Sequence, residues 1–418
     1  MQNVSDDSLL LHKKINIFTS HHTKRGRKKN TSFSVVETMN LLIKTAAFVG
    51  VSTVGLTYLA SSPYAPFEIP ETMSSIQSIS KGKIGLVQDI PTASLIPTKP
   101  NQFLVKMAYA PVNPSDVYTA LRESDYGFDE VTYPHTNGFE GSGTVVASGG
   151  GLIPFLYTFF NLNVAVIPGV PITWSEYVLV DDLMKSIPLF LAFPFWSSKN
   201  VNVLQKGSAA VVNPGTVMGF LETAKEINET SMVHTAANSA LGKMLIRAAN
   251  VTDVNIIAVV RGDRNERELV EDLQHDPELV IRSDKATFVE DLSFACKKLG
   301  TRLVFDAIAG PFTDQIAKAL KLSGVEEPLV YVYGDLSGEM HKSKRKYPFW
   351  HLRTFLEEPG MEDSRALTLM KGILSMLKNE LSTSFKHVVK LTDPKTIDVL
   401  KQYESHQKGG KIVISMEN

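Results

Sequence analysis

The chain contains 418 residues, with 43 Lys and Arg against 44 Asp and Glu, 43% hydrophobic residues and a single cysteine. The net charge of -1 excludes a global field that would attract nucleic acid, and the lone Cys296 excludes an internal disulfide and a cysteine-rich zinc lobe. This length and apolar content predict two folded domains preceded by a tail.

The N-terminal region differs in composition from the rest of the chain. Residues 1–40 are polar, include a basic run at 21–29 and lack apolar periodicity, which predicts a disordered tail. Nucleic-acid binding is not expected, because the tail is short and lacks interleaved aromatic residues. Residues 61–81, rich in Pro and Ser, are expected to form a linker.

Residues 41–60 are mainly apolar, carry one charge at Lys44 and are long enough to cross a bilayer. Three interpretations stay open. The segment is a retained transmembrane anchor, it is a cleaved targeting segment, or the true first residue is Met39 rather than Met1. As an anchor, it would leave the basic tail in the cytosol or the mitochondrial matrix.

A first domain with mostly β structure is predicted at residues 82–212, completed by residues 380–418. Alternating apolar residues separated by Gly and Pro favour short strands. These strands are expected at residues 84–87, 102–107, 143–147, 174–180 and 411–414.

A second domain is predicted at residues 213–379, where strands and helices alternate. The strands are expected at 231–235, 255–260, 303–306 and 329–333, and the helices at 240–249, 266–273, 313–322 and 364–379. This alternation predicts an α/β fold with a doubly wound parallel sheet.

The first βα turn of this domain has the spacing of a phosphate-binding loop. Ala236, Ser239 and Gly242 follow a small-x-x-small-x-x-Gly pattern, which leaves room for a pyrophosphate at the helix N-terminus. The side chains of Asn238 and Ser239 are also able to donate to phosphate. A plain helix start, capped by Asn238 or Ser239, would give the same pattern, so both interpretations stay open.

The next strand ends in two arginines, Arg261 and Arg264. They stand about twenty residues after the glycine turn, where the adenosine ribose of a dinucleotide is held. Arginine suits a 2′-phosphate and therefore favours NADPH. The nearby Asp263 leaves NADH open, as does the interpretation of both arginines as solvated turn residues.

Four motifs, taken together, resemble a known family. They are Tyr-Ala-Pro-Val-Asn-Pro-Ser-Asp at 109–116, Asn-Gly-Phe-Glu-Gly-Ser-Gly at 137–143, the turn at 236–242 and Lys-Gly-Gly-Lys at 408–411. The chain resembles the zinc-free medium-chain dehydrogenase/reductase superfamily, most of all the mitochondrial-type trans-2-enoyl-CoA reductases and quinone oxidoreductases. The resemblance implies a GroES-like catalytic domain, a Rossmann cofactor domain and no metal.

The same resemblance implies a set of residues around NADPH. Asn213 would contact the cofactor at the domain junction, and Arg261 and Arg264 would hold the 2′-phosphate. Lys411 would close the site. The pyrophosphate would be held by Asn238, Ser239, Ala240, Leu241 and Gly242. The nicotinamide half would lie along Tyr333, Gly334, Asp335 and Leu336, flanked by Phe349, Trp350, His351 and Leu352.

The resemblance also implies two catalytic residues. Reduction of an α,β-unsaturated carbonyl needs a hydride on one carbon, a proton on its neighbour and donors for the enolate oxygen. Tyr126 is the implied acid, and Asn113 would orient the site from its Asn-Pro turn. Tyr118 and Tyr133 are the alternatives for the acid.

The function predicted is NADPH-dependent reduction of an enoyl thioester or a quinone by a mitochondrial homodimer. The alternative is a non-catalytic, membrane-tethered subunit of a larger assembly. Three features favour that alternative: the apolar segment 41–60, Ala240 where these reductases commonly have glycine, and the apolar stretch 152–160, which replaces a polar turn. The apolar stretch is expected to be a loop that forms core, a partner surface or a membrane contact.

Overall fold

The computed structural model describes residues 61–121, 132–167, 169–193, 202–339, 343, 346–358, 360–403 and 411–417. All of them lie in one compact unit that begins at Thr53. The predicted tail at 1–40 and the apolar segment at 41–60 lie outside the described residues and stay predictions. Among the residues that are described, no helix is both long and apolar enough to cross a membrane.

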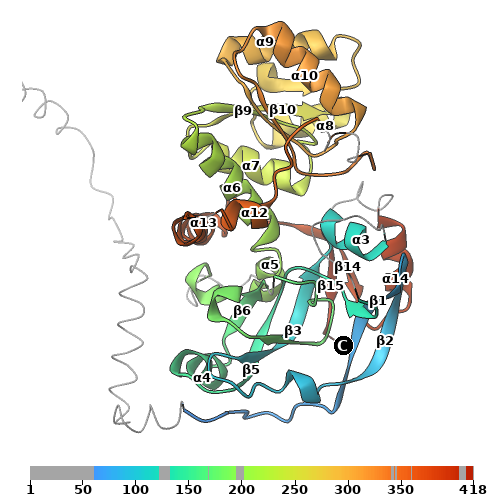
Figure 1. Cartoon of the computed structure of the whole chain (residues 1–418). Helices are drawn as coiled ribbons and strands as arrows, with labels where there is room; N and C mark the ends of the chain where they lie inside the picture. The colour runs from blue at the N-terminus through green and yellow to red at the C-terminus, as the bar shows by residue number, and fades with distance from the viewer. Residues whose placement is uncertain are drawn as a thin grey trace, which may run out of the picture. The chain divides into compact units, whose positions relative to one another are not determined.

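The first part of the fold is built on a seven-stranded sheet, ordered β14-β15-β3-β5-β6-β8 with β7 also paired to β3 (Figure 1). Its strands are β3 (Phe103–Pro111), β5 (Gly141–Ser148), β6 (Asn163–Val166), β7 (Tyr177–Val180), β8 (Ser186–Pro188), β14 (Phe385–Lys390) and β15 (Lys411–Ser415). β3 lies at the centre, and Phe103, Val105 and Met107 pack against Val145 and Val178. The C-terminal strand β15 pairs with β3, so the end of the chain returns to this domain.

The predicted linker at 61–81 is wrong in its second half, which forms strand β1 (Thr72–Ser80). β1 pairs antiparallel with β2 (Lys83–Pro91) and with the short β4 (His135–Thr136). The buried residues of β1 include Ser75 and Ser78 beside Ile76. Serines at buried positions hid the apolar alternation by which a strand is predicted.

The predicted apolar loop at 152–160 is also wrong, because most of it forms helix α4 (Leu152–Phe159). Pro154, Phe155 and Thr158 are buried, at the spacing of one helix face. Leu152 and Phe159 on the remaining surface are 48% and 55% exposed. The interpretation as core therefore holds for one face of α4 only.

The second part is a parallel sheet, as predicted, with five strands ordered β11-β10-β9-β12-β13. The short edge strand β11 was not among the four that were predicted. Helices cover both faces. On the central strand β9, Met232 packs with Phe220 and Leu245 on one face, and Val233 packs with Leu292 on the other. The strands are β9 (Ser231–His234), β10 (Asn255–Val260), β11 (Val280–Arg282), β12 (Leu303–Asp306) and β13 (Leu329–Val332).

The described helices include several that the sequence pattern did not predict. The helices of the second part, predicted or not, are α6 (Val212–Glu226), α7 (Ala240–Ala249), α8 (Asp263–Arg267), α9 (Phe288–Leu299), α10 (Pro311–Ser323), α12 (Leu352–Leu356) and α13 (Glu362–Met376). The helices of the first part are α3 (Pro114–Leu121), α4, α5 (Val203–Gly207) and α14 (Lys395–Lys401).

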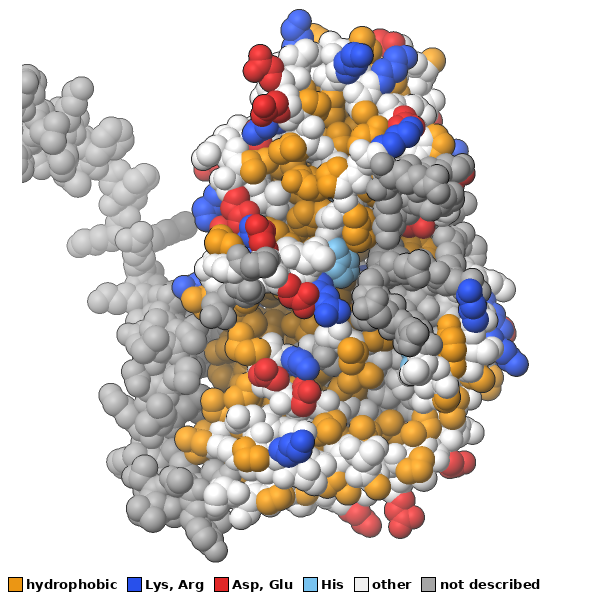
Figure 2. Space-filling view, in the orientation of Figure 1, with side chains coloured by type: hydrophobic (Ala, Val, Ile, Leu, Met, Phe, Trp, Pro, Cys, Tyr) orange, Lys and Arg blue, Asp and Glu red, His pale blue; other side chains and the backbone are white. Residues whose placement is uncertain are grey.

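On the face of the molecule seen in Figure 2, side chains of both charge signs are interspersed.

Helix α6 was missed because it contains Pro214, Gly215 and Gly219, which usually indicate a loop. Pro214 lies in the first turn, where its missing N–H costs nothing. At Gly219 a Cβ atom would lie 2.7 Å from the ring of Trp350, so the glycine lets that ring pack on the helix. Two glycines thus serve packing rather than a turn.

Candidate active site

A cavity of about 380 Å³ lies between the mostly-β part and the parallel-sheet part. The structure brings most of the predicted site residues to this one cavity. Those that line it are Asn113, Asn213, residues 238–241, residues 333–336, residues 350–352 and Lys411. They come from segments far apart in the sequence, because the ends of several strands and helices meet here.

Five of the predicted site residues are not among those that line the cavity. Tyr126 lies outside the described residues. Gly242 lies beneath the turn, and Phe349 forms a β-bridge with Val332. Arg261 and Arg264 lie at the C-terminal end of β10 with exposed side chains. Their roles stay predictions.

The turn between β9 and α7 has the backbone of a tight phosphate-type loop. Ala236 has a positive φ of 51°, and a Cβ on Gly242 would lie 2.3 Å from the carbonyl oxygen of Ala237. Only glycine fits there.

The two side chains predicted to donate to phosphate in this turn are already engaged. Ser239 Oγ accepts the N–H of Gly242 at 3.1 Å, which is the plain helix cap considered from the sequence. Asn238 Nδ2 donates to Asn265 Oδ1 at 2.7 Å and to Glu268 Oε2 at 3.0 Å. The donors that a helix leaves free are the backbone N–H groups of its first turn, and Ala240 in that turn lines the cavity.

Another part of the cavity wall lies at the start of α3. Asn113 precedes α3, and Asp116 Oδ2 accepts the backbone N–H of Asn113 at 2.7 Å. Asp116 Oδ1 also accepts the N–H of Phe139 at 2.9 Å. Burial of the Asp116 carboxyl outweighs these donors and raises its pKa from 3.8 to about 7.

Asn113, Glu140 and the partly buried Lys411 link the start of α3 to α6 and β15. Asn113 Nδ2 donates to Glu140 Oε1 at 3.0 Å, and Lys411 Nζ donates to Asn113 Oδ1 at 2.7 Å. Glu140 Oε2 accepts the N–H groups of Val211 and Val212 at 3.0 and 2.9 Å. Burial lowers the pKa of Lys411, while the Glu140 and Asp116 carboxylates act in the opposite direction. The Asn113 amide is therefore fixed from both sides.

Sequence reasoning missed Glu140 and His234 as parts of the site. Glu140 gave a weak signal, because it is a charged residue immediately before an apolar strand. His234 Nε2 lies 2.9 Å from Tyr333 Oη, and burial lowers the pKa of this imidazole to about 3. A neutral histidine thus fixes the phenol of Tyr333, which lines the cavity.

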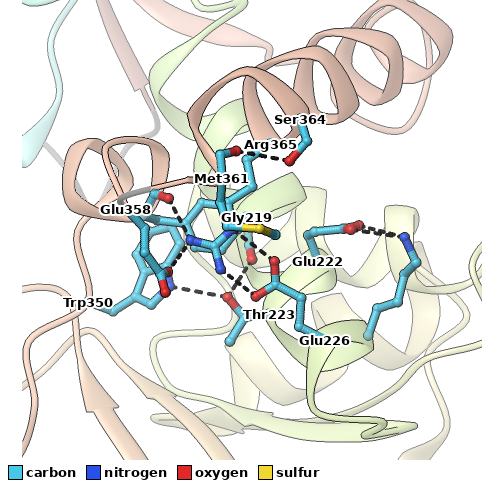
Figure 3. A network of polar contacts seen from close by, with 11 residues as sticks. Gly219, Glu222, Thr223, Glu226, Trp350, Glu358, Met361, Ser364 and Arg365 are labelled. Atoms are coloured by element: carbon cyan, nitrogen blue, oxygen red, sulfur yellow. Dashed lines mark hydrogen bonds and ion pairs between the residues drawn. The ribbon is translucent and has the colours of Figure 1, made fainter.

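Helix α6 supports the cavity wall at Trp350. Trp350 Nε1 donates to Thr223 Oγ1 at 3.3 Å. At the end of α6, Glu226 accepts from Arg365 of α13, with distances of 2.9 and 2.7 Å (Figure 3). The Arg365 guanidinium also lies 4.2 Å from the centre of the Phe355 ring. These contacts hold α12 and α13 on α6 and keep Trp350 in place.

The family described as the alcohol dehydrogenase GroES-like domain matches residues 99–157. Among curated proteins, the mitochondrial enoyl-acyl-carrier-protein reductase of Arabidopsis thaliana is 26% identical over 58% of this chain and 60% of that protein. The enzyme of the same name from Homo sapiens is 24% identical over 63% of this chain and 67% of that protein. This chain therefore spans about two thirds or less of the length of these relatives.

Solved structures share the fold over most of the chain. A candidate NADPH:quinone reductase from Mesorhizobium loti has a TM-score of 0.64 and 21% identity, covering 84% of this chain and 100% of that one. The mitochondrial 2-enoyl thioester reductase Etr1p/Etr2p heterodimer from Candida tropicalis has a TM-score of 0.58 and 20% identity, covering 82% and 99%. The comparisons confirm the resemblance to the medium-chain dehydrogenase/reductase superfamily, of the enoyl reductase and quinone oxidoreductase type.

Proposed function

We propose that this chain is an NADPH-dependent reductase of an activated double bond, with a trans-2-enoyl thioester or a quinone as substrate. One observation carries the proposal. The start of α7 and residues 333–336 form one wall of the cavity, and Asn113 and Lys411 form the facing wall. Hydride transfer requires a dinucleotide held opposite polar groups that bind the substrate, and these two walls are suited to those tasks.

The residues present fit a nicotinamide dinucleotide. The first turn of α7 offers backbone donors and the positive end of a helix dipole to a diphosphate. At Gly334 a Cβ would lie 2.7 Å from the carbonyl oxygen of Ala307, so the two backbones are closely packed. Gly334 also lines the cavity, where it presents backbone and no side chain. When bound, NADPH supplies the hydride. Residues 238–241 would hold its phosphates, and residues 350–352 with Asn213 would contact its nicotinamide half.

The preference for NADPH over NADH is supported by the charges at the end of β10. Three carboxylates that follow β10 and β11 in the sequence are all bound by the guanidinium of Arg282. These carboxylates are Asp263, Glu266 and Asp284. Because Arg282 engages the carboxylates, Arg261 and Arg264 are left for a 2′-phosphate.

The chain's own chemistry centres on Asn113 and Lys411. Lys411 is partly buried and lines the cavity, where a cation stabilises negative charge that develops on an enolate oxygen. The proton donor we propose is Tyr126, with Tyr118 as the rival. Tyr118 is buried and lines the cavity, whereas Tyr133 is 43% exposed and does not line it.

The test is NADPH oxidation by the purified full chain with trans-2-enoyl-CoA thioesters and with quinones. Tyr126→Phe and Tyr118→Phe are compared, with Tyr133→Phe as the matched control. Loss of the acid is expected to lower kcat by about a hundredfold or more in one of the first two variants, with no change in the control. Absence of turnover with every substrate would reject the reductase in favour of the non-catalytic, membrane-tethered subunit.

We infer a mitochondrial location and a dimer for the same protein. The curated relatives are named as mitochondrial enzymes, and the Candida tropicalis relative is a heterodimer. Fractionation of cells and light scattering of the purified chain test these two inferences separately. A cytosolic monomer would contradict both without bearing on the reductase.

A further inference from the structure

A second group of cations lines the cavity, apart from Lys411. Lys243 and Arg247 are four residues apart on α7, and therefore share one helix face. Lys386 of β14 lines the cavity with them. Lys243 forms an ion pair with Glu268, while the exposed Lys386 has no hydrogen bond or ion pair within the described part of the chain.

Arg247 carries a charge that no contact neutralises. Its Nε donates to the carbonyl oxygen of Glu380 and its Nη2 to that of Ser382, both at 2.9 Å. Both acceptors are backbone carbonyls rather than carboxylates. Burial lowers the pKa of this guanidinium, and the Glu380 carboxylate opposes that effect only as a nearby charge. A bound anion near the Arg247 guanidinium would therefore be stabilised.

The side chain of Thr383, next to the carbonyl that Arg247 binds, is the second feature of this end of the cavity. Its side chain lines the cavity and is only 7% exposed. Its hydroxyl oxygen is buried and has no hydrogen-bond partner among the described residues. Buried hydroxyls are nearly always paired with a protein or water atom, so this hydroxyl beside the cavity has a hydrogen bond still to be made.

The charges around this group do not balance. The three cations of Lys243, Arg247 and Lys386 outnumber the two carboxylates near them, Glu268 in an ion pair with Lys243 and Glu380 as a nearby charge. Glu268 also accepts from Asn238, so it is held in place as the residue that positions Lys243. The net charge that remains at this end of the cavity is positive.

We propose that Lys243, Arg247, Thr383 and Lys386 form a phosphate-binding end of the cavity. The ligand is a phosphate group that belongs either to the nicotinamide cofactor or to the coenzyme-A-type carrier of a thioester substrate. The assignment of these two sources rests on the proposed function. The hydroxyl and the ammonium groups donate to the phosphate oxygens, and the guanidinium adds charge without leaving its backbone acceptors.

The test avoids Arg247, because that side chain also joins α7 to the segment before β14. Lys386→Met and Thr383→Val are prepared in the full chain, with Lys390→Met as the matched control. Lys390 is exposed on the same strand and does not line the cavity. Calorimetric titrations use NADPH, coenzyme A and inorganic pyrophosphate as separate probes.

We expect the Kd of at least one probe to rise about tenfold in Lys386→Met and in Thr383→Val, with Lys390→Met unchanged. The melting temperature of Thr383→Val is expected to stay level or rise, because the hydroxyl removed has no partner in the protein. Weaker binding of NADPH assigns the phosphate to the cofactor. Weaker binding of coenzyme A alone assigns it to the substrate carrier.

Unchanged Kd values in both variants, or no binding of any probe by the wild type, would overturn the phosphate-binding end. The proposed function fails by a different result. A chain that binds coenzyme A or pyrophosphate through Lys386 and Thr383 but never oxidises NADPH would retain this site and lose the reductase. A chain that reduces substrate with both variants unimpaired in binding would do the reverse.

Discussion

The two ends of helix α6 are both held by buried charged groups, yet they differ in what lies beyond. At the N-terminal end, Glu140 binds the first backbone N–H groups and connects through Asn113 to Lys411. At the C-terminal end, Glu226 is bound by Arg365. The first cluster opens on the cavity, whereas Arg365 and Glu226 are not among the residues that line it.

The cluster at the N-terminal end is therefore a candidate chemical site, whereas the ion pair at the C-terminal end holds helices together. Glu140 complements the helix dipole, but Glu226 at the opposite end is opposed by it and depends on Arg365. Arg365 also binds Glu358, so its charge is fully matched by carboxylates. In the cluster at the cavity, burial shifts the pKa values of Asp116 and Lys411 instead. Shifted pKa values beside a cavity indicate function more strongly than a closed ion pair does.

The largest effect is expected at the end that opens on the cavity. Glu140→Ala removes the larger of the two carboxylate charges that act on Lys411. It also leaves the Asn113 amide and two backbone N–H groups without an acceptor. The free energy of unfolding should fall by about 3 to 5 kcal/mol, measured by urea denaturation. The control is Glu222→Ala in the middle of α6, which loses only a partly exposed ion pair with Lys225 and should cost less than about 1 kcal/mol. Equal losses of unfolding free energy in Glu140→Ala and Glu222→Ala would contradict the special role of Glu140.

The closed end should affect stability and leave the chemistry alone. Arg365→Met removes the partner of Glu226 and Glu358, which are partly exposed, and is expected to cost about 1 to 2 kcal/mol in urea denaturation. Arg353→Met, which breaks an exposed pair with Glu357, is the control and should cost under about 1 kcal/mol. If Arg365→Met shifted the pH profile of kcat as well, the C-terminal end would not be merely structural.

The pH dependence of stability tests the Asp116 carboxyl, whose folded pKa is raised from 3.8 to about 7. The folded chain binds this proton more tightly than the unfolded chain, so the stabilising contribution is complete below pH 3.8 and is lost as pH rises through about 7. Between these values this group should lower the free energy of unfolding by at most about 1.4 kcal/mol per pH unit. Asp116→Asn should flatten the slope; identical slopes in both proteins would contradict the assignment.

The smallest effect is expected where α6 supports Trp350. Thr223→Val removes the acceptor of the Trp350 indole N–H and should cost about 1 kcal/mol. The emission of Trp350 should change in the same variant. A change in nucleotide affinity with no loss of stability would mean that Thr223 acts on the cavity directly.

Much of the fold could be predicted from the sequence because its elements follow local patterns. β10, β12 and α7 begin and end at the predicted residues, since their apolar periodicity is uninterrupted. β1 and α6 were missed because serine, proline and glycine occupy positions that tertiary packing fills. Local patterns carry no information about such packing.

The candidate site was predictable where motifs stand at the ends of strands and helices, as at 238–241 and 333–336. It was not predictable where a role depends on a distant partner. Glu140 meets Val211 across 71 residues, and Arg365 meets Glu226 across 139. The unpaired hydroxyl of Thr383 likewise becomes evident only once the segment before β14 is placed against α7.

We propose that the cavity binds NADPH between its two walls. The most direct test of this binding is calorimetric titration of the full chain with NADPH and NADH, in the wild type and in Arg261→Ala. The full chain is used because a fragment that starts at residue 82 would lack β1. We expect tighter binding of NADPH than of NADH, with the NADPH affinity reduced about tenfold in Arg261→Ala and the NADH affinity unchanged. Failure of the wild type to bind either nucleotide would contradict this proposal.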